Sequence, residues 1–248
     1  MDRHSLGSGS AMITLEQAKI GYGSVPLFAP LSGHFSTGSL TAIVGVNGAG
    51  KSTLLKTLAG LHPLQGGNLY FSNNPPPRMS YLPQHTELDR QFPIRVSDLV
   101  AMGNWARSGI LGGLNKCAVR QITDSLECVS MTAMAGSPVG ELSGGQLQRV
   151  LFARLLVQQA PLILLDEPFT GIDNTTTELL VQVIQKLQKQ GRTLITVLHD
   201  MSLVINNFPQ ILLLTPQSCY WGDADKILKH IPEFNISRQP KYHMAAVS

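Results

Sequence analysis

The chain has 248 residues, of which 43% are hydrophobic and 14% are charged, and its formal net charge is +3. This length supports one large domain with a sizeable core, and no apolar run approaches the roughly 18 residues of a transmembrane helix. The small, dispersed excess of positive charge gives no basis for a nucleic-acid partner. The cysteines are widely spaced without a metal-ligand pattern, so we expect reduced thiols in a cytoplasmic protein. They are Cys117, Cys128 and Cys219.

The N-terminal part predicts a leader followed by strands. Residues 1–11 are expected to form a flexible leader, and residues 12–15 and 18–20 are expected to form strands. Tyr22 follows in a Gly-Tyr-Gly sequence. Its ring can stack on a nucleotide base, or it can be an ordinary turn tyrosine, and the neighbouring residues alone favour the turn.

Residues 45–52, Gly-Val-Asn-Gly-Ala-Gly-Lys-Ser, match the phosphate-loop pattern G-x-x-x-x-G-K-[ST] at every fixed position. They lie between an apolar run at 40–44, which predicts a buried strand, and leucines at helical spacing over 54–61. The glycines let backbone N–H groups approach phosphate oxygens, and the helix N-terminus adds partial positive charge. Lys51 is expected to bind the β- and γ-phosphates, and the Ser52 hydroxyl a Mg²⁺ ion. The loop therefore predicts binding of a nucleoside triphosphate.

The middle of the chain changes from strand-like to helical patterns. Residues 68–71 and 79–82 predict strands. Gln84 follows the second strand and is either a contact to a metal or water near a phosphate or an ordinary loop residue. Strand signals then fade, and Ser97 is expected to cap a short helix. We expect a helical subdomain at about residues 87–158, inserted into an α/β domain.

Two more helices are expected within this insertion. Asn115 is placed to cap the first of them. Its apolar face is expected to consist of Val119, Ile122, Leu126 and Val129. The second helix opens with Ser143, Gly144, Gly145 and Gln146. This junction is either a second anion site, by the same physics as the phosphate loop, or an N-cap and turn.

Acidic residues follow another buried strand. Residues 162–165 are apolar throughout and lead into Asp166 and Glu167. Two adjacent carboxylates beside a core are costly unless they are paired or bound to a metal. The aspartate can bind Mg²⁺, and the glutamate can orient or polarise an attacking water.

The C-terminal part continues the alternation of strands and helices. Asp173 is placed to cap a helix that should end near Gly191. Residues 193–198 predict a strand beside residues 162–165, so His199 at its end either contacts a γ-phosphate or is structural. The remaining elements are expected at 211–214 (strand), 218–223 (hairpin), 225–230 (helix) and 233–248 (loosely ordered tail). These elements predict one domain over residues 12–232.

Taken in order, these motifs resemble the nucleotide-binding subunit of ATP-binding-cassette (ABC) transporters over nearly the whole chain. The matches are Walker A at 45–52, the Q-loop at Gln84, the signature at 142–146, Walker B at 162–167, the D-loop at Asp173 and the switch histidine at His199. The signature is decisive because Walker motifs occur in many unrelated NTPases. The resemblance implies an α/β fold, a P-loop NTPase of ABC type. It has a mostly parallel core sheet, an N-terminal antiparallel β subdomain and an inserted α-helical subdomain.

The resemblance also implies roles for single residues. Glu167 would be the general base, His199 the γ-phosphate sensor and Lys51 a catalytic phosphate contact, and Tyr22 would stack on adenine. The implied ATP contacts are Tyr22, Gly45, Asn47, Gly48, Ala49, Gly50, Lys51, Ser52, Thr53, Ser143, Gly144, Gly145, Gln146 and Asp173. The implied Mg²⁺ contacts are Ser52, Gln84 and Asp166.

The partners that the resemblance implies begin with a second copy of the chain. In a head-to-tail homodimer, each ATP would lie between the phosphate loop of one copy and the signature loop of the other. ATP would close the dimer and hydrolysis would reopen it. Residues 87–138 of the helical subdomain would dock on an integral membrane permease, which places the chain peripherally on the cytoplasmic face of the inner membrane. A periplasmic or lipoprotein substrate-binding protein would be an indirect partner.

Residues 92–103 and 169–173 are similar to the corresponding segments of bacterial zinc and manganese importers. The leading hypothesis is therefore an ATPase that powers uptake of a divalent metal. The alternatives are an importer of an iron chelate, siderophore, haem or vitamin B12, and a soluble ABC ATPase not coupled to transport. A cassette protein that acts on nucleic acid in repair or translation is a further alternative. It predicts long coiled coils or two cassettes in one chain, and this sequence contains neither. Gly171, Ile172, Leu147 and Leu198 depart from common family residues, but none of these departures removes a catalytic group, so activity is expected.

Overall fold

The computed structural model describes residues 10–23, 25–84, 93–105 and 115–229. The expected leader up to residue 9, residues 87–92 and 106–114 of the insertion, and the tail at 233–248 lie outside the described residues. The strands are β1 (Ala11–Lys19), β2 (Gly21–Tyr22), β3 (Val25–Pro26), β4 (Leu31–Ser36), β5 (Leu40–Gly45), β6 (Gly66–Phe71), β7 (Met79–Leu82), β8 (Leu162–Asp166), β9 (Thr193–Val197), β10 (Gln210–Leu214) and β11 (Cys219–Asp223). The α-helices are α1 (Lys51–Leu58), α2 (Val96–Ala101), α4 (Lys116–Cys128), α5 (Gly144–Val157), α6 (Asn174–Lys189), α7 (Met201–Asn207) and α8 (Ala224–Lys229). Short 3₁₀ turns lie at Met102–Asn104, Thr132–Met134 and Val139–Glu141.

A six-stranded sheet forms the centre of the molecule, with the strand order β11-β10-β5-β9-β8-β7. The neighbouring strands from β10 to β7 pair in parallel, and only β11 is antiparallel. Every residue of β8 and β9 is buried, as expected for parallel strands covered on both faces. The expected mostly parallel core sheet is therefore confirmed, and β8 and β9 are neighbours as predicted.

A second sheet of three antiparallel strands, in the order β4-β1-β6, forms the N-terminal β subdomain. The two strands expected at 12–15 and 18–20 are one continuous strand, β1. A register shift separates Leu15 from Ala18, and Gln17 there has a left-handed φ of 48°. This bulge interrupts the alternation of residues, which explains why the sequence pattern indicated two strands.

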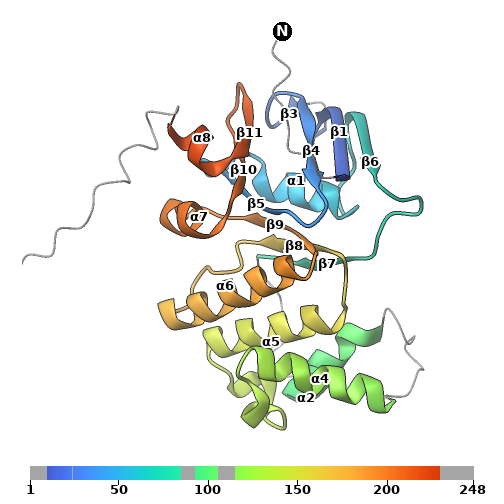
Figure 1. The fold of residues 1–248 in the computed structure, drawn as a ribbon, viewed down its shortest axis with the longest axis vertical. Helices are drawn as coiled ribbons and strands as arrows, with labels where there is room; N and C mark the ends of the chain where they lie inside the picture. Colours follow the sequence, from blue (N-terminus) through green and yellow to red (C-terminus); the bar gives the residue numbers. More distant parts are fainter. Residues whose placement is uncertain (1–9, 24, 85–92, 106–114, 230–248) are drawn as a thin grey trace, which may run out of the picture.

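Helix α1 lies between the two sheets (Figure 1). Its residues Leu54, Leu55 and Leu58 are fully buried and share one hydrophobic cluster with β1 and β4 on one side and the central sheet on the other. Because α1 begins at the last residues of the phosphate loop, this packing fixes the loop against both sheets.

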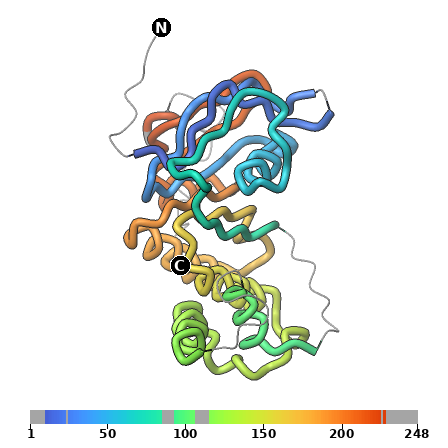
Figure 2. Tube along the Cα trace, turned by 90° about the vertical axis from the view of Figure 1, so that its right-hand side faces the viewer, coloured from blue at the N-terminus to red at the C-terminus, as the bar shows by residue number. Residues whose placement is uncertain are grey.

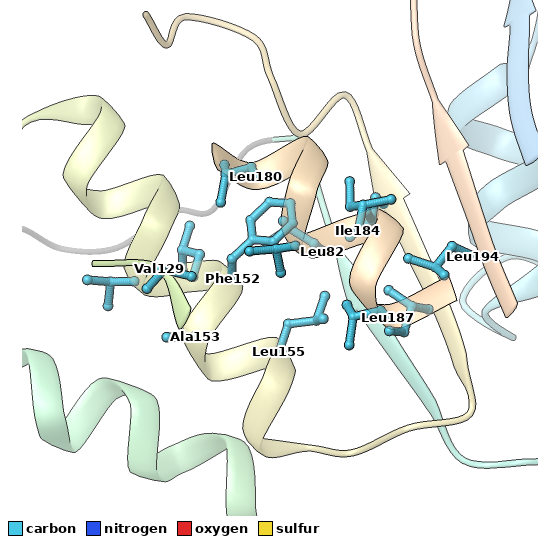
Figure 3. Packing of buried hydrophobic residues seen from close by; sticks show 14 of the residues in the cluster. Leu82, Val129, Phe152, Ala153, Leu155, Leu180, Ile184, Leu187 and Leu194 are labelled. Atoms are coloured by element: carbon cyan, nitrogen blue, oxygen red, sulfur yellow. The ribbon is translucent and has the colours of Figure 1, made fainter. Parts of the chain in front are cut away.

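Helices α5 and α6 cover the opposite face of the central sheet. Phe152 of α5 is fully buried and lies among Leu180 of α6 and Leu82 of β7 (Figure 3). Burying a side chain of this size stabilises a fold by about 1.5–3 kcal/mol. This cluster joins the helical part of the chain to the strand that leads to Gln84.

The short helices α2 and α4 pack on α5 at the end of the molecule farthest from the three-stranded sheet (Figure 2). The predicted cap at Asn115 is confirmed, because its side chain accepts a hydrogen bond from the Ala118 N–H at 2.8 Å. The predicted cap at Ser97 is wrong, since α2 begins at Val96 and its N-cap is Arg95, two residues before Ser97. Val119 is 50% exposed and does not belong to the buried face of α4.

Candidate functional site

The candidate site lies at the carboxyl ends of β5, β8 and β9, the edge where open α/β sheets bind ligands. A cavity of about 570 Å³ opens there. Among the described residues, its lining consists of Tyr22, Leu27, Asn47, Gly48, Gly50, Lys51, Ser52, Thr53, Gln84, Glu167 and His199. Three predicted groups therefore meet in one place: the phosphate loop, the acidic strand end and the switch histidine.

The phosphate loop is held closely against the central sheet. Gly45 has a left-handed φ of 152°, and a Cβ on it would lie 2.4 Å from the Leu214 carbonyl oxygen, so glycine is required there. Ala49, a predicted ATP contact, is buried and packs in the core beneath the loop. Neither Gly45 nor Ala49 lines the cavity. They shape the loop, whereas the predicted contacts Asn47, Gly48, Gly50, Ser52 and Thr53 face the cavity.

Lys51 is largely buried, with 6% of its surface exposed. Its ammonium group donates hydrogen bonds to the carbonyl oxygens of Gly45 at 2.9 Å and Val46 at 3.0 Å. Burial lowers the pKa of Lys51, and the carboxylates of Glu167 and Asp166 partly offset that effect. The positive charge is thus placed in the middle of the loop, where a polyphosphate would lie.

Asp166 is the most buried acidic group at the site, with 2% of its surface exposed. The Ser52 hydroxyl donates to its Oδ1 at 2.8 Å, and the Tyr81 hydroxyl donates to its Oδ2 at 3.4 Å. Tyr81 was not predicted from the sequence. It pairs with Leu164 across β7 and β8, so strand alternation places it on the same sheet face as Asp166.

The residues at this point suit a Mg²⁺ ion. Mg²⁺ prefers oxygen ligands and is bound in nucleotide sites by one or two protein groups together with phosphates. The Ser52 hydroxyl and the Asp166 carboxylate provide two such oxygens 2.8 Å apart, and Gln84 lines the same cavity. The donor set therefore fits the predicted metal contacts.

Replacing Asp166 with Asn is expected to raise the melting temperature of the nucleotide-free protein at neutral pH by a few degrees. Burial is the main reason that the pKa of Asp166 is raised, although the Ser52 hydrogen bond opposes it. The folded state then binds a proton more readily than the unfolded state, so this carboxyl group destabilises the fold increasingly as pH rises above its unfolded pKa. Thermal unfolding of both proteins between pH 4 and 8 checks this. The gain should shrink toward pH 4, and a gain that is equal at every pH would contradict the explanation.

Glu167 lines the cavity and has a strained backbone conformation, with φ at 48°. Its Oε2 accepts hydrogen bonds from Gln84 Nε2 at 2.9 Å and from the Thr170 hydroxyl at 3.2 Å. His199 Nδ1 lies 3.7 Å from the same oxygen. Gln84 therefore contacts the acidic strand end directly. Thr170 contacts the same carboxylate, which the sequence did not indicate.

Tyr22 projects beside the phosphate loop, with 60% of its surface exposed. Its hydroxyl lies 3.4 Å from the Thr53 hydroxyl. Leu27, which the sequence did not single out, also lines the cavity. An exposed ring and an apolar side chain in the same lining suit a planar base.

The signature residues lie outside this cavity. Ser143 caps α5 with a complete capping box, in which its hydroxyl accepts from the Gln146 N–H at 3.2 Å and Gln146 Oε1 accepts from the Ser143 N–H at 2.9 Å. A Cβ on Gly145 would lie 3.2 Å from Asp173 Oδ2. Asp173 caps α6 through the Thr176 N–H, and this backbone hydrogen bond lowers its pKa. The signature and the D-loop therefore form a second group, and neither lines the cavity.

Comparisons with known proteins agree with this geometry. The ABC transporter family profile matches residues 28–170. Manganese transport system ATP-binding protein MntB of Listeria innocua is 42% identical over 197 residues, which cover 78% of this chain and 82% of the relative. Zinc transport system ATP-binding protein TroB of Treponema pallidum is 37% identical over 206 residues, which cover 82% of this chain and 77% of that relative.

Solved structures show the same fold. An ABC transporter in an inward-facing conformation aligns with a TM-score of 0.80 at 26% identity, covering 92% of this chain and 88% of that one. A dimeric bacterial ABC transporter cassette aligns with a TM-score of 0.73 at 23% identity, covering 86% and 99%. The matching profile, the relatives and the cavity built from Walker A, Walker B and the switch histidine show that this chain belongs to the ABC transporter family, as one of its ATP-binding ATPase subunits.

Proposed function

We propose that this chain hydrolyses ATP to power the uptake of a divalent metal, zinc or manganese, through a separate membrane permease. The observation that carries the proposal is the meeting of Lys51, Glu167 and His199 at one cavity. The choice of cargo is supported by the relatives that are named for manganese and zinc transport.

Glu167 is the proposed general base. The hydrogen-bond and ion-pair partners that the structure describes for its side chain all contact Oε2. Its other oxygen, Oε1, is then the one that takes a proton from the attacking water. His199, more than half exposed at the cavity, is placed to contact the γ-phosphate. Lys51 would exchange its contacts with the loop carbonyls for phosphate oxygens.

Ser52, Asp166 and Gln84 are the proposed Mg²⁺ contacts. These residues would hold the ion, which would supply positive charge against the negative charge that develops during phosphoryl transfer. Ser52 and Asp166 are already hydrogen-bonded to each other, so little rearrangement of these side chains is needed. Gln84 also contacts Glu167 at 2.9 Å, which links the proposed metal contacts to the proposed base.

A second copy of the chain is the proposed partner for the signature loop. Ser143, Gly144, Gly145 and Gln146 form a helix N-terminus suited to an anion, yet the nucleotide cavity of the same chain does not include them. A head-to-tail dimer resolves this, because the signature loop of one copy would complete the site of the other. Asp173 beside Gly145 would lie at the same interface.

The permease is proposed to contact the helical end of the molecule, where α2 and α4 pack on α5. None of the helices that the structure describes has both the length and the apolar character to traverse a bilayer. A peripheral position at the cytoplasmic face of the inner membrane, next to a permease served by a substrate-binding protein, follows from the proposal.

Metal accumulation tests the proposed function. Cells that carry the wild-type chain, the Glu167→Gln variant or the control Glu16→Gln are compared for uptake of zinc, manganese and iron, because Glu16 is exposed on β1, outside the cavity. We expect Glu167→Gln to lose zinc or manganese uptake and Glu16→Gln to keep it. Loss of iron uptake only would instead support a chelate importer, and unchanged uptake of all three metals would contradict the proposal.

A further inference from the structure

Tyr22 lies on a short two-stranded element that has little stability of its own. Strands β2 and β3 contain two residues each and form a separate two-stranded ribbon, in which Tyr22 pairs with Val25. An isolated ribbon of this kind is marginally stable at best. An exposed aromatic ring on it needs contacts from another part of the chain to keep one orientation.

His62 provides two such contacts. Its Nε2–H donates a hydrogen bond to the Gly21 carbonyl oxygen at 2.8 Å, because a carbonyl can only accept. Its ring packs against the Tyr22 ring, with centroids 4.9 Å apart and planes inclined by 59°. This tilted arrangement is a favourable geometry for two aromatic rings. His62 thus contacts both the backbone before Tyr22 and the side chain of Tyr22.

Gln65 contacts the backbone on the C-terminal side of Tyr22. Its side-chain amide donates to the Gly23 carbonyl oxygen at 2.6 Å, and its backbone N–H donates to the Lys19 carbonyl oxygen at 2.9 Å. The carbonyls on both sides of Tyr22 are therefore bound by the segment that follows α1. Since α1 begins at Lys51, this one helix connects the phosphate loop to the segment that contains His62 and Gln65.

We propose that His62 is a positioning residue for the nucleotide base: it fixes the Tyr22 ring in the orientation in which the ring stacks on adenine. The proposal rests on the proposed function, because it requires that Tyr22 stacks on a base. His62 is not part of the cavity lining, so its effect passes through Tyr22. Holding the ring before the nucleotide arrives lowers the conformational entropy lost on binding.

A double-mutant cycle tests this proposal with the full chain. His62→Ala is expected to weaken ATP binding by about three- to tenfold, the range that an aromatic pair of this kind supports. It should leave the affinity for inorganic tripolyphosphate unchanged, because the phosphate loop is untouched. In a Tyr22→Ala background, His62→Ala should cause no further loss. His34→Ala on β4 serves as the control, since none of the contacts described for Gly21, Tyr22 and Gly23 involves that histidine.

Two conservative variants separate the contacts and keep the test valid if His62→Ala unfolds. His62→Phe keeps the ring beside Tyr22, and His62→Gln keeps a donor for the Gly21 carbonyl, so each should retain part of the ATP affinity. Equal losses from His62→Ala with and without Tyr22, or a matching loss of tripolyphosphate affinity, would overturn the proposal. Wild-type ATP affinity in Tyr22→Ala would also overturn it, because no stacking would exist. Failure of the wild-type chain to hydrolyse ATP would instead overturn the proposed function.

Discussion

Replacing Glu167 with Gln is expected to lower the rate constant of ATP hydrolysis by about 10²- to 10⁴-fold, the contribution typical of a general base. The amide can still accept hydrogen bonds from Gln84 and Thr170, which contact the carboxylate at 2.9 and 3.2 Å. It cannot take a proton from water. ATP affinity should therefore remain close to that of the wild type, and an ATP-bound dimer should accumulate.

Phosphate release, fluorescent-nucleotide binding and size-exclusion chromatography with ATP measure these three quantities. Glu16→Gln is the matched control, because it removes the same charge from an exposed position on β1. Hydrolysis by Glu167→Gln at the wild-type rate would show that Glu167 is not the base. A loss of ATP affinity would show that the residue acts in binding instead.

Replacing Gly144 with Asp is expected to weaken the ATP-dependent dimer strongly while leaving each chain folded and able to bind ATP. Gly144 is the first residue of α5, where an acidic side chain is favourable for the helix by about 0.3–1 kcal/mol. Among the described residues, only the Gly171 carbonyl oxygen lies within 4 Å of a Cβ placed there, at 3.9 Å. The new carboxylate would face the triphosphate of the second copy, and like charges brought together at an interface cost several kcal/mol. Dimer formation should weaken by roughly 10²-fold or more.

The same change should reduce ATP hydrolysis to the level of isolated chains. Gly144→Ala is the control, because it adds the Cβ without the charge, and it should dimerise nearly as well as the wild type. The dimer is best measured in the Glu167→Gln background, where ATP is not consumed. Normal dimerisation of Gly144→Asp with ATP would refute the head-to-tail arrangement.

The inner strands of the central sheet could be predicted because they are short, largely apolar runs, as residues 162–165 illustrate, and are buried on both faces. Strand β4 was not predicted. Its sequence, Leu-Ser-Gly-His-Phe-Ser, contains only two fully buried residues, Leu31 and Phe35. Helix α7 was missed for a similar reason, since Val204 is its only buried residue. Elements that bury few side chains carry a weak periodic signal.

The contacts between motifs could not be predicted. The sequence located Asp166 and Glu167, but Tyr81 and Thr170 reach these carboxylates only through the sheet register and the following turn. His62 contacts Tyr22 from 40 positions away in the chain, and no local pattern marks it. A motif identifies the groups that react, whereas their supporting contacts depend on tertiary structure.

Strand β7 lies at the edge of the central sheet and, within the part of the chain that the structure describes, pairs only with β8. Its last residue, Leu82, belongs to the hydrophobic cluster that includes α5, and two residues later Gln84 contacts Glu167. A strand bonded on one side resists displacement with one ladder of hydrogen bonds instead of two. β7 is therefore held in the sheet by a single ladder of hydrogen bonds, between the nucleotide cavity and the helical end. The stiffness of that connection depends on four residue pairs, from Met79↔Leu162 to Leu82↔Leu165.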